Sequence, residues 1–507
     1  MIFSSFEFIY LFFPVTFLGF LLFRRMNSER GIVLWLITMS LAFYAYWNPP
    51  YLFLLLASVG LNYLLHLHIR RYRDPWVLGF GIAANLSAIA YYKYAGFFAG
   101  TVKAISGAQF DLGDIALPLA ISFFTFQQIA FLVETYRGKI ADCGFAKYTL
   151  FVVFFPQLIA GPIVMQKETV PQFTLSVFQN RLALNVTIGL SIFIIGLFKK
   201  LVLADSVAPY ATAVFGPADA GAIIPFTLAW SGALAYTFQI YFDFSGYCDM
   251  AIGLARCFGI RLPINFNSPY KATSIVDFWR RWHITLSHFL RDYLYIPLGG
   301  NRGGKAQRYM NLSITMLLGG LWHGASWTFV VWGGLHGFYL MVNHAWTALR
   351  GEGYSASPFE RFLGRGLTLL AVVVAWVFFR AETFGGAASI LQGMAGLNGF
   401  FLAGESPSEL VAAAKGVAES YALFIPMAFI VWALPNTAEL AASYRPTLYF
   451  RKALGQDTWK VDRSRWSGLF RWRPTPLWIG SLSVMAVIGV TQMYRLGDLS
   501  EFIYYNF

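Results

Sequence analysis

Two histidines lie in an apolar stretch, residues 318–337, which reads LGGLWHGASWTFVVWGGLHG. His323 has glycines on both sides, and glycines let a second helix or an elongated substrate approach the backbone closely. An imidazole titrates near neutral pH, so it can take a proton from a hydroxyl and return it to a leaving group. Trp322 and Trp327 are placed to wall a pocket around it. The residue types indicate a general base at His323 or, as the alternative, a hydrogen-bonded structural histidine.

The other histidines give weaker signals. His336 would lie about 20 Å from the first histidine along a continuous helix, which is too far for the two to bind one metal ion. No H-E-x-x-H motif or comparable ligand cluster occurs, so we expect no metal site. His66, His68 and His344 lie near predicted helix ends, which favours solvated or snorkelling positions. His283, in WRRWHITLS, has no evident structural role.

The segments that carry these histidines are predicted to cross a membrane. Of 507 residues, 57% are hydrophobic and 12% are charged, and this charged fraction is about half that of a soluble domain. Apolar stretches long enough to span a bilayer recur along the chain. The predicted spans are 6–23, 31–47, 50–69, 76–92, 114–133, 146–165, 183–204, 222–242, 311–322, 326–347, 366–379, 420–441 and 475–493. We expect an all-α integral membrane protein with about 10 to 13 transmembrane helices plus re-entrant or interfacial helices.

The net charge of +13 is distributed between the predicted spans and forms no continuous nucleic-acid surface. Positive loops near span ends stay in the cytoplasm. The basic clusters that we place there are 24–30, 69–73, 137–147 and 445–473. The N-terminus and the stretches 100–113 and 404–410 are then outside. The first span lacks a basic n-region and a small-residue cleavage site, so we expect it to be retained.

The centre of the chain, residues 243–310, is too polar and too rich in proline for an ordinary span. Within it, residues 275–293 have the three-and-four spacing of an amphipathic helix. Asp243 and Asp249 are six residues apart and do not share a helix face, so a paired-carboxylate acid/base device is disfavoured. We expect each carboxylate to be satisfied locally, by hydroxyls such as that of Ser245 or by arginines of the following helix.

The remaining charged and sulfur-containing groups suggest structural roles. A cysteine nucleophile at Cys248 would need an activating base, and none is adjacent in the sequence. The three cysteines are widely spaced, which predicts neither a disulfide framework nor a metal site. The ion pairs that we predict at span ends join Glu134 with Arg137, and Lys199 and Lys200 with Asp205.

Several motifs occur in a specific order, and their order and spacing are more specific than any one of them. They are YYKYAGFF (91–98), SFFTFQQIAFLVETYRG (122–138), FPQLIAGPI (155–163), GLFKKLVLAD (196–205), YFDFSGYCDMAIG (241–253), NFNSPY (265–270), FWRRWHITLSHFLRDYLYIPLGGNR (278–302) and LLGGLWHGASWTFVVWGGLHG (317–337). In these motifs the chain resembles the membrane-bound O-acyltransferase (MBOAT) family, in its bacterial alginate O-acetyltransferase-like branch. One departure is Cys248, where a serine is common.

The resemblance covers residues 1–350 and implies an acyltransferase core there. Residues 351–507 would add C-terminal helices, with the basic cytoplasmic loop 445–473, to the same membrane domain. The family's invariant histidine falls on His323, and a second functional position falls on His283. The resemblance also implies a tunnel through the helix bundle, with substrate or tunnel candidates Trp322, Trp282, Asn267, Asp243 and Ser245. Candidates for binding the donor's phosphates are Arg280, Arg281 and Lys305.

The function that the resemblance implies is transfer of an acetyl group from a cytoplasmic thioester across the bacterial inner membrane. The donor would be acetyl-CoA or another acyl thioester, with no permanently bound cofactor. The acceptor would be an exported or cell-surface polysaccharide resembling alginate, reached with a periplasmic hydrolase-like partner. A D-alanyl or peptidoglycan O-acyltransferase is the alternative enzyme. A transporter or flippase is the non-enzyme alternative, and the absence of inverted repeats weighs against it.

Overall fold

The computed structural model describes residues 1–107, 113, 115–140, 143–351, 353–400, 407–448, 471–496 and 502–503. Every regular element within these ranges is a helix, and the one isolated β-bridge joins Pro263 and Leu448. The prediction of an all-α protein is confirmed.

Six helical stretches in the described part are long and apolar enough to cross a membrane. They are Glu7–Arg25, Pro49–Tyr72, Leu182–Asp219, Pro358–Arg380, Ala414–Ala433 and Pro476–Arg495. Their outer surfaces carry large exposed apolar side chains, among them Phe53 (76% exposed) and Ile425 (72% exposed). Apolar side chains exposed on helices of this length face lipid. The chain is therefore a multi-pass membrane protein.

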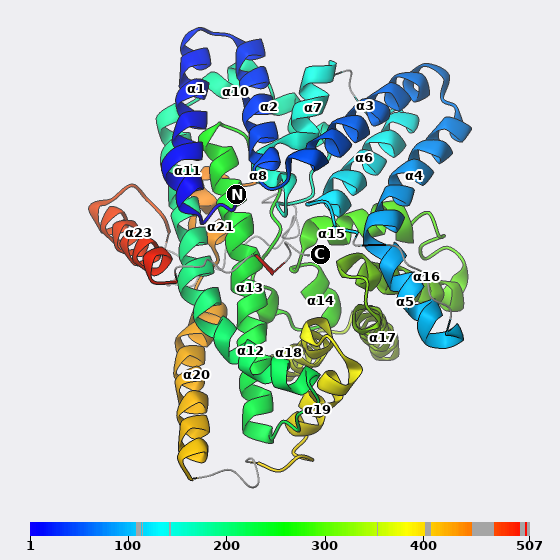
Figure 1. The fold of residues 1–507 in the computed structure, drawn as a ribbon, viewed down its shortest axis with the longest axis vertical. Helices are drawn as coiled ribbons and strands as arrows, with labels where there is room; N and C mark the ends of the chain where they lie inside the picture. The colour runs from blue at the N-terminus through cyan, green and yellow to red at the C-terminus, as the bar shows by residue number, and fades with distance from the viewer. Residues whose placement is uncertain are drawn as a thin grey trace.

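The N-terminal helices form one group, in which α3, α4 and α6 lie beside one another (Figure 1). Their bounds are η1 (Glu7–Phe12), α1 (Phe13–Arg25), α2 (Glu29–Ala45), α3 (Pro49–Tyr72), α4 (Pro75–Ile89), η2 (Ala90–Tyr94), α5 (Ala95–Ser106) and α6 (Ile121–Tyr136). His66 on α3 is fully buried against α6, with Nδ1 2.8 Å from Oγ1 of Thr135. The prediction of a solvated or snorkelling His66 is wrong, because packing between the two helices encloses the ring.

Short elements follow α6 and do not cross the molecule. They are α7 (Phe145–Val153), α8 (Phe155–Leu158), α9 (Gln166–Thr169), η3 (Val170–Gln172) and α10 (Leu175–Gln179). The span predicted over residues 146–165 is wrong, since the helix ends at Val153 and Pro156 opens a separate short turn. Nearly all of this stretch is buried inside the protein, where irregular backbone is tolerated at membrane depth.

The core of the bundle is built on α13 (Phe226–Cys257), a helix of 32 residues that lies beside α11 (Leu182–Phe198), η4 (Lys199–Ala204) and α12 (Asp205–Asp219). Glycines let α11 and α13 touch. A Cβ on Gly196 would lie 2.6 Å from the carbonyl oxygen of Gly246, and one on Gly253 would lie 2.5 Å from that of Gly189. α13 continues without a break through Asp243 and Asp249, and it is not among the six helical stretches that are apolar enough to cross a membrane.

Both aspartates on α13 are paired with lysines of η4. Lys200 Nζ lies 2.8 Å from Asp243 and 2.9 Å from Asp205, and Lys199 Nζ lies 2.6 Å from Asp249. The predicted Lys200–Asp205 pair is confirmed, as is the Glu134–Arg137 pair at 3.0 Å. The predicted arginine partners are wrong, since η4 is a π-helix whose wider turn presents both lysines to α13. We call these five side chains, Lys199, Lys200, Asp205, Asp243 and Asp249, the lysine–carboxylate cluster.

The C-terminal half adds short central helices and then longer outer ones (Figure 1). Their bounds are η5 (Pro269–Lys271), α14 (Ile275–Trp279), α15 (Ile284–Leu290), η6 (Arg291–Tyr295), α16 (Gly304–His323), α17 (Trp327–Arg350), α18 (Pro358–Arg380), α19 (Phe384–Met394), α20 (Pro407–Ala433), α21 (Thr437–Leu440), η7 (Ala442–Tyr444) and α23 (Pro476–Leu496). The turns α1–α2 and α3–α4 lie at one end of the molecule, as the basic clusters 24–30 and 69–73 predict. Of the stretches 404–410 and 445–473, residues 404–406 and 449–470 fall outside the described residues.

Candidate active site

The apolar stretch 318–337 is two helices and not one. α16 ends at His323, Gly324 is extended, and the Ser326 hydroxyl accepts a hydrogen bond from Thr328 N at the start of α17. A Cβ on Gly320 would lie 2.2 Å from the carbonyl oxygen of Phe329, so only glycine lets the chain fold back this tightly. The continuous helix assumed for the spacing of the two histidines is therefore wrong.

His323 lies where α16 turns into α17, and it is 1% exposed. Its ring contacts Trp322 and Trp332, each with a centroid distance of 4.9 Å, and Phe379 at 5.1 Å. Trp327, which we predicted to wall this pocket, is 50% exposed. That prediction is wrong because Trp327 begins α17 on its outer side, and Trp332, more than one turn later, takes the inner position.

His283 occupies a break in what we predicted as one amphipathic helix. Residues 275–293 form α14, a turn, α15 and the start of η6, and His283 has a left-handed backbone (φ 41°) before α15. The prediction of a continuous helix is wrong. The side chain is fully buried, and its ring packs edge-on against Phe244 of α13 at 4.8 Å. A backbone held in this sparsely populated region is a common feature of functional sites.

One indole connects the two histidines. The Trp322 ring lies 6.1 Å from the His283 ring and 4.9 Å from the His323 ring. On its other side it stacks on Phe126 of α6, with a centroid distance of 5.6 Å. The structure therefore brings together His283, Trp322 and His323, which we call the histidine site, from two segments forty residues apart in the sequence.

The histidine site holds polar atoms that lack hydrogen-bond partners. Within the described chain, His283 Nε2, Trp322 Nε1 and Trp332 Nε1 are buried and make no hydrogen bond. Buried polar atoms in proteins are nearly always paired, so each of these nitrogens is available to a substrate atom or a water molecule. Two indole N–H donors beside His323 are suited to stabilise negative charge that develops on an oxygen.

His336 contacts the same aromatic rings, but its hydrogen bonding differs from that of His283. Its ring lies 4.8 Å from that of Trp332, and the Trp279 indole N–H donates to its Nδ1 at 3.3 Å. The proton-accepting nitrogen is therefore occupied, and Nε2 carries the hydrogen.

Sequence reasoning missed Lys93, which lies in η2 just after α4. Its ammonium donates to the carbonyl oxygen of Trp322 at 2.5 Å, and the Tyr94 hydroxyl donates to that of Leu321 at 2.8 Å. These two donors satisfy carbonyls at the end of α16, where the helix dipole also favours a cation. A signal was present, since a lysine in the apolar YYKYAGFF indicates a functional position at membrane depth.

The other predicted tunnel residues do not all gather at the histidines. Trp282 is 1% exposed and stacks on Phe278 at 5.7 Å, while Asn267 accepts a hydrogen bond from Asn436 at 3.0 Å. Asp243 belongs to the lysine–carboxylate cluster. Ser245 lines a cleft with about 420 Å³ of open space, whose wall includes Lys199, Cys248, Asp249, Asn265 and Thr437.

The three predicted phosphate-binding residues differ in availability. Arg280 and Lys305 are exposed. Arg281 is half-buried and binds Asp277 at 2.8 Å and the carbonyl oxygen of Asn267 at 3.4 Å. The guanidinium of Arg281 therefore holds the loop before His283, whereas Arg280 and Lys305 have side chains available to a soluble anion.

Comparison with known proteins identifies the family. The model for the membrane-bound O-acyltransferase family matches residues 32–379. A peptidoglycan O-acetyltransferase of Helicobacter pylori is 45% identical over 79% of this chain and 81% of its own. A probable alginate O-acetylase of Azotobacter vinelandii is 43% identical over 75% of each chain. A teichoic acid D-alanyltransferase of Streptococcus thermophilus is 28% identical over 45% of this chain and 57% of its own. The chain belongs to the membrane-bound O-acyltransferase family and is an O-acyltransferase.

Proposed function

We propose that this protein moves an acetyl group from a cytoplasmic thioester, acetyl-CoA or another acyl thioester, across the bacterial inner membrane. The acceptor is a hydroxyl of an exported or cell-surface polysaccharide, and a periplasmic hydrolase-like partner assists delivery. One observation supports this most: two buried imidazoles, His283 and His323, flank the Trp322 indole inside an apolar bundle. A thioester from one face and a hydroxyl from the other could meet there.

The reaction follows from these groups. An imidazole nitrogen of His323 takes the proton of the acceptor hydroxyl, and the oxygen attacks the thioester carbonyl carbon. The indole N–H groups of Trp322 and Trp332 stabilise the oxyanion that forms. The carbon–sulfur bond then breaks, and the sulfur leaves with a proton as a free thiol. The products are an O-acetyl ester and the thiol, so no further reactant is needed.

The apolar surroundings suit this reaction. His323 and His283 are 1% and 0% exposed, and aromatic rings surround both. A site that excludes water protects the thioester from hydrolysis and strengthens the hydrogen bonds to developing charge. We propose that a tunnel through the bundle leads both substrates here, and that Arg280 and Lys305 contact the phosphates of the donor.

The acceptor has two candidates. Relatives that are 43% and 45% identical carry the names of an alginate O-acetylase and a peptidoglycan O-acetyltransferase, so carbohydrate hydroxyls are the shared chemistry. We favour an alginate-like exported polysaccharide, and peptidoglycan is the second candidate. Incubating membranes that contain the protein with labelled acetyl-CoA and either purified glycan distinguishes them, because only the true acceptor gains label.

The decisive experiment uses purified protein in proteoliposomes with acetyl-CoA. We expect free CoA thiol to be released, and His323→Ala to lower this rate by about 10² to 10⁴, the usual contribution of a general base. His68→Ala is the matched control, because this ring is exposed and lies at the end of α3. Undiminished release by His323→Ala would contradict the mechanism. No turnover with any thioester, alone or with a partner, would favour a transporter.

A further inference from the structure

The loop after α13 holds the turn that carries His283. The backbone N–H of Asn267 donates to the carbonyl oxygen of Arg281 at 2.9 Å, and that of Ile284 donates to the carbonyl oxygen of Asn265 at 3.0 Å. These two bonds align residues 265–267 with residues 281–284. As a result, the side chain of Asn265 lies directly against His283.

The orientation of the Asn265 carboxamide is fixed by its other partners. Its Oδ1 lies 3.2 Å from the backbone nitrogen of Thr285 and 2.9 Å from the Thr285 hydroxyl. A backbone N–H can only donate, so the atom that it faces must be the carboxamide oxygen. The Ile163 N–H donates to Thr285 Oγ1 at 3.0 Å, which leaves the hydroxyl proton for Asn265.

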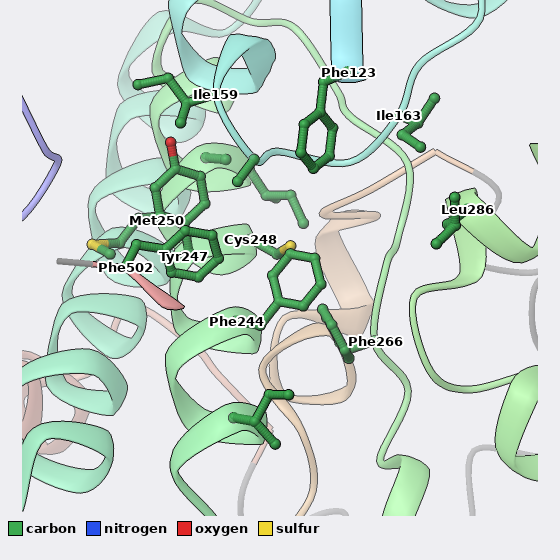
Figure 2. Packing of buried hydrophobic residues seen from close by; sticks show 14 of the residues in the cluster. Phe123, Ile159, Ile163, Phe244, Tyr247, Cys248, Met250, Phe266, Leu286 and Phe502 are labelled. Carbon is green, nitrogen blue, oxygen red and sulfur yellow. The ribbon is translucent and has the colours of Figure 1, made fainter. Parts of the chain in front are cut away.

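The amide end of the same side chain points away from the histidine. Nδ2 of Asn265 donates to Cys248 Sγ on α13 at 3.3 Å. Figure 2 shows Cys248 close to Phe244 and Phe266, the two rings that also contact the His283 ring. A flipped carboxamide would face one N–H with another, so the observed orientation is the only one that pairs every atom.

This orientation decides where His283 carries its proton. Nδ1 of His283 lies 3.2 Å from Asn265 Oδ1, and a carboxamide oxygen only accepts. Nδ1 must therefore bear the hydrogen, and Nε2 of the neutral ring keeps its lone pair. Among the described residues Nε2 has no hydrogen-bond partner. His336 shows the opposite arrangement, since the Trp279 N–H occupies its Nδ1.

We propose that Asn265 is a positioning residue that fixes His283 in the Nδ1–H form, so that Nε2 is a proton acceptor during acyl transfer. The inference rests on the proposed function. His323 and His283 together take up the acceptor's proton, and the share of Nε2 of His283 is to hold it at the histidine site. It then moves from Nε2 to the leaving sulfur, giving the thiol. The Asn265 carbonyl stabilises the transient imidazolium through the Nδ1–H bond.

The test compares two substitutions at Asn265 in the full-length protein in proteoliposomes, with acetyl-CoA as the probe. Asn265→Ala removes the acceptor for Nδ1–H, so we expect kcat for CoA release to fall about 10- to 100-fold, as for other residues that orient a histidine. We expect KM for acetyl-CoA to stay unchanged, because in this proposal Asn265 acts through the His283 ring and not on the donor.

Asn265→Asp separates a positioning role from a structural one, because the aspartate side chain has nearly the same shape as that of asparagine. A carboxylate still accepts from Nδ1–H, and its charge stabilises the imidazolium. The variant should stay active, with the acidic limb of its kcat/KM profile displaced to higher pH. A purely structural asparagine would give no such displacement. A profile that coincides with that of the unmodified protein, or an inactive but folded Asn265→Asp, would overturn the proposal.

Cys248→Ala is the matched control, because it removes the partner of Nδ2 and leaves Oδ1 untouched. We expect its rate and pH profile to match those of the unmodified protein. If Asn265→Ala does not fold, the pH profile of Asn265→Asp decides alone. Failure of the proposed function is distinguishable, since the unmodified protein would then release no CoA at all. Failure of this inference would leave that release intact and the Asn265 variants unaffected.

Discussion

The lysine–carboxylate cluster and the histidine site are both polar groups inside the same apolar bundle, and they differ in how their atoms are paired. In the cluster, each aspartate lies within 2.9 Å of a lysine, and Asp243 also accepts from the backbone N–H of Ile503. At the histidine site and the adjoining Trp332, three buried nitrogens lack hydrogen-bond partners within the described ranges. Both groups lie beside α13, so depth in the bundle does not explain the difference.

The difference separates polar groups that hold the fold from those that are open to substrate. A buried network of ion pairs rigidifies a structure, whereas a buried donor or acceptor that no protein group occupies is available to a substrate. We therefore expect changes in the cluster to lower stability and changes at the histidine site to lower activity. Each prediction below tests one side of this comparison.

The largest expected effect is on the chemistry at His283. His283→Gln should lower kcat for CoA release by about 10² to 10⁴ because the amide cannot take up a proton at the pH of the reaction. The melting temperature should stay close to that of the unmodified protein, since glutamine can still donate to Asn265. The rate is measured by thiol release in proteoliposomes and the melting temperature by intrinsic fluorescence in detergent. A large fall in the melting temperature would mean that His283 is mainly structural.

The second largest effect is expected on the stability of the fold, when the lysine–carboxylate cluster is changed. Lys200→Met leaves Asp205 and Asp243 buried without their shared cation, which should cost about 3 to 5 kcal/mol in the free energy of unfolding. Adding Asp205→Asn should recover part of this loss, because one of the two unpaired carboxylates is then neutral. Denaturant unfolding in detergent micelles measures both variants. An equal stability of the single and double variants would show that the two side chains are not coupled.

Part of the site could be predicted from the sequence. Glycine-flanked His323 and the motif that contains His283 were identifiable, because residue type and neighbours are local properties. Their proximity could not be predicted, because it depends on two interruptions of the helices, at His283 and at Gly324. The spacing of apolar residues does not reveal either interruption. The break at Gly324 folds α17 back against α16, and together the two breaks bring distant segments onto one indole.

The partners of buried charges were the least predictable part of the fold. The lysines of η4 reach α13 because the wider turn of a π-helix rotates the following side chains relative to those of an α-helix. A hydropathy pattern does not reveal such a turn. The sequence marks Lys93 as a lysine in an apolar segment, but its contact with the carbonyl oxygen of Trp322 at the end of α16 is visible only in the structure. Membrane class was predictable because it depends on composition and on the length of the apolar segments.

The third prediction concerns His336, which shares Trp332 with His323 but has its acceptor nitrogen occupied. His336→Phe leaves the Trp279 N–H buried and unpaired, which should cost about 1 to 3 kcal/mol in the free energy of unfolding. His336→Gln supplies an oxygen in place of Nδ1 and should cost less. Thiol release per folded molecule should remain within about tenfold for both variants, well above the residual rate expected of His283→Gln. A loss as large as that of His283→Gln would place His336 in the proton path.

The smallest effect is expected at the rim of the bundle, where Glu29 begins α2. Its carboxylate lies 2.7 Å from Lys147 Nζ and accepts from the backbone N–H of Leu175 at 2.8 Å. The hydrogen bond from Lys147 holds the pKa of Glu29 below its ordinary value. The pair therefore stabilises the fold above the pKa of glutamate in the unfolded chain, and this contribution is lost as pH falls through the lower pKa of the folded state.

Glu29→Gln should cost about 0.2 to 1 kcal/mol in the free energy of unfolding at neutral pH, because water and salt screen a partly exposed pair. The difference in melting temperature should shrink as the pH is lowered below the ordinary range of glutamate. A difference that stays constant with pH would show that Glu29 acts through packing and not through its charge.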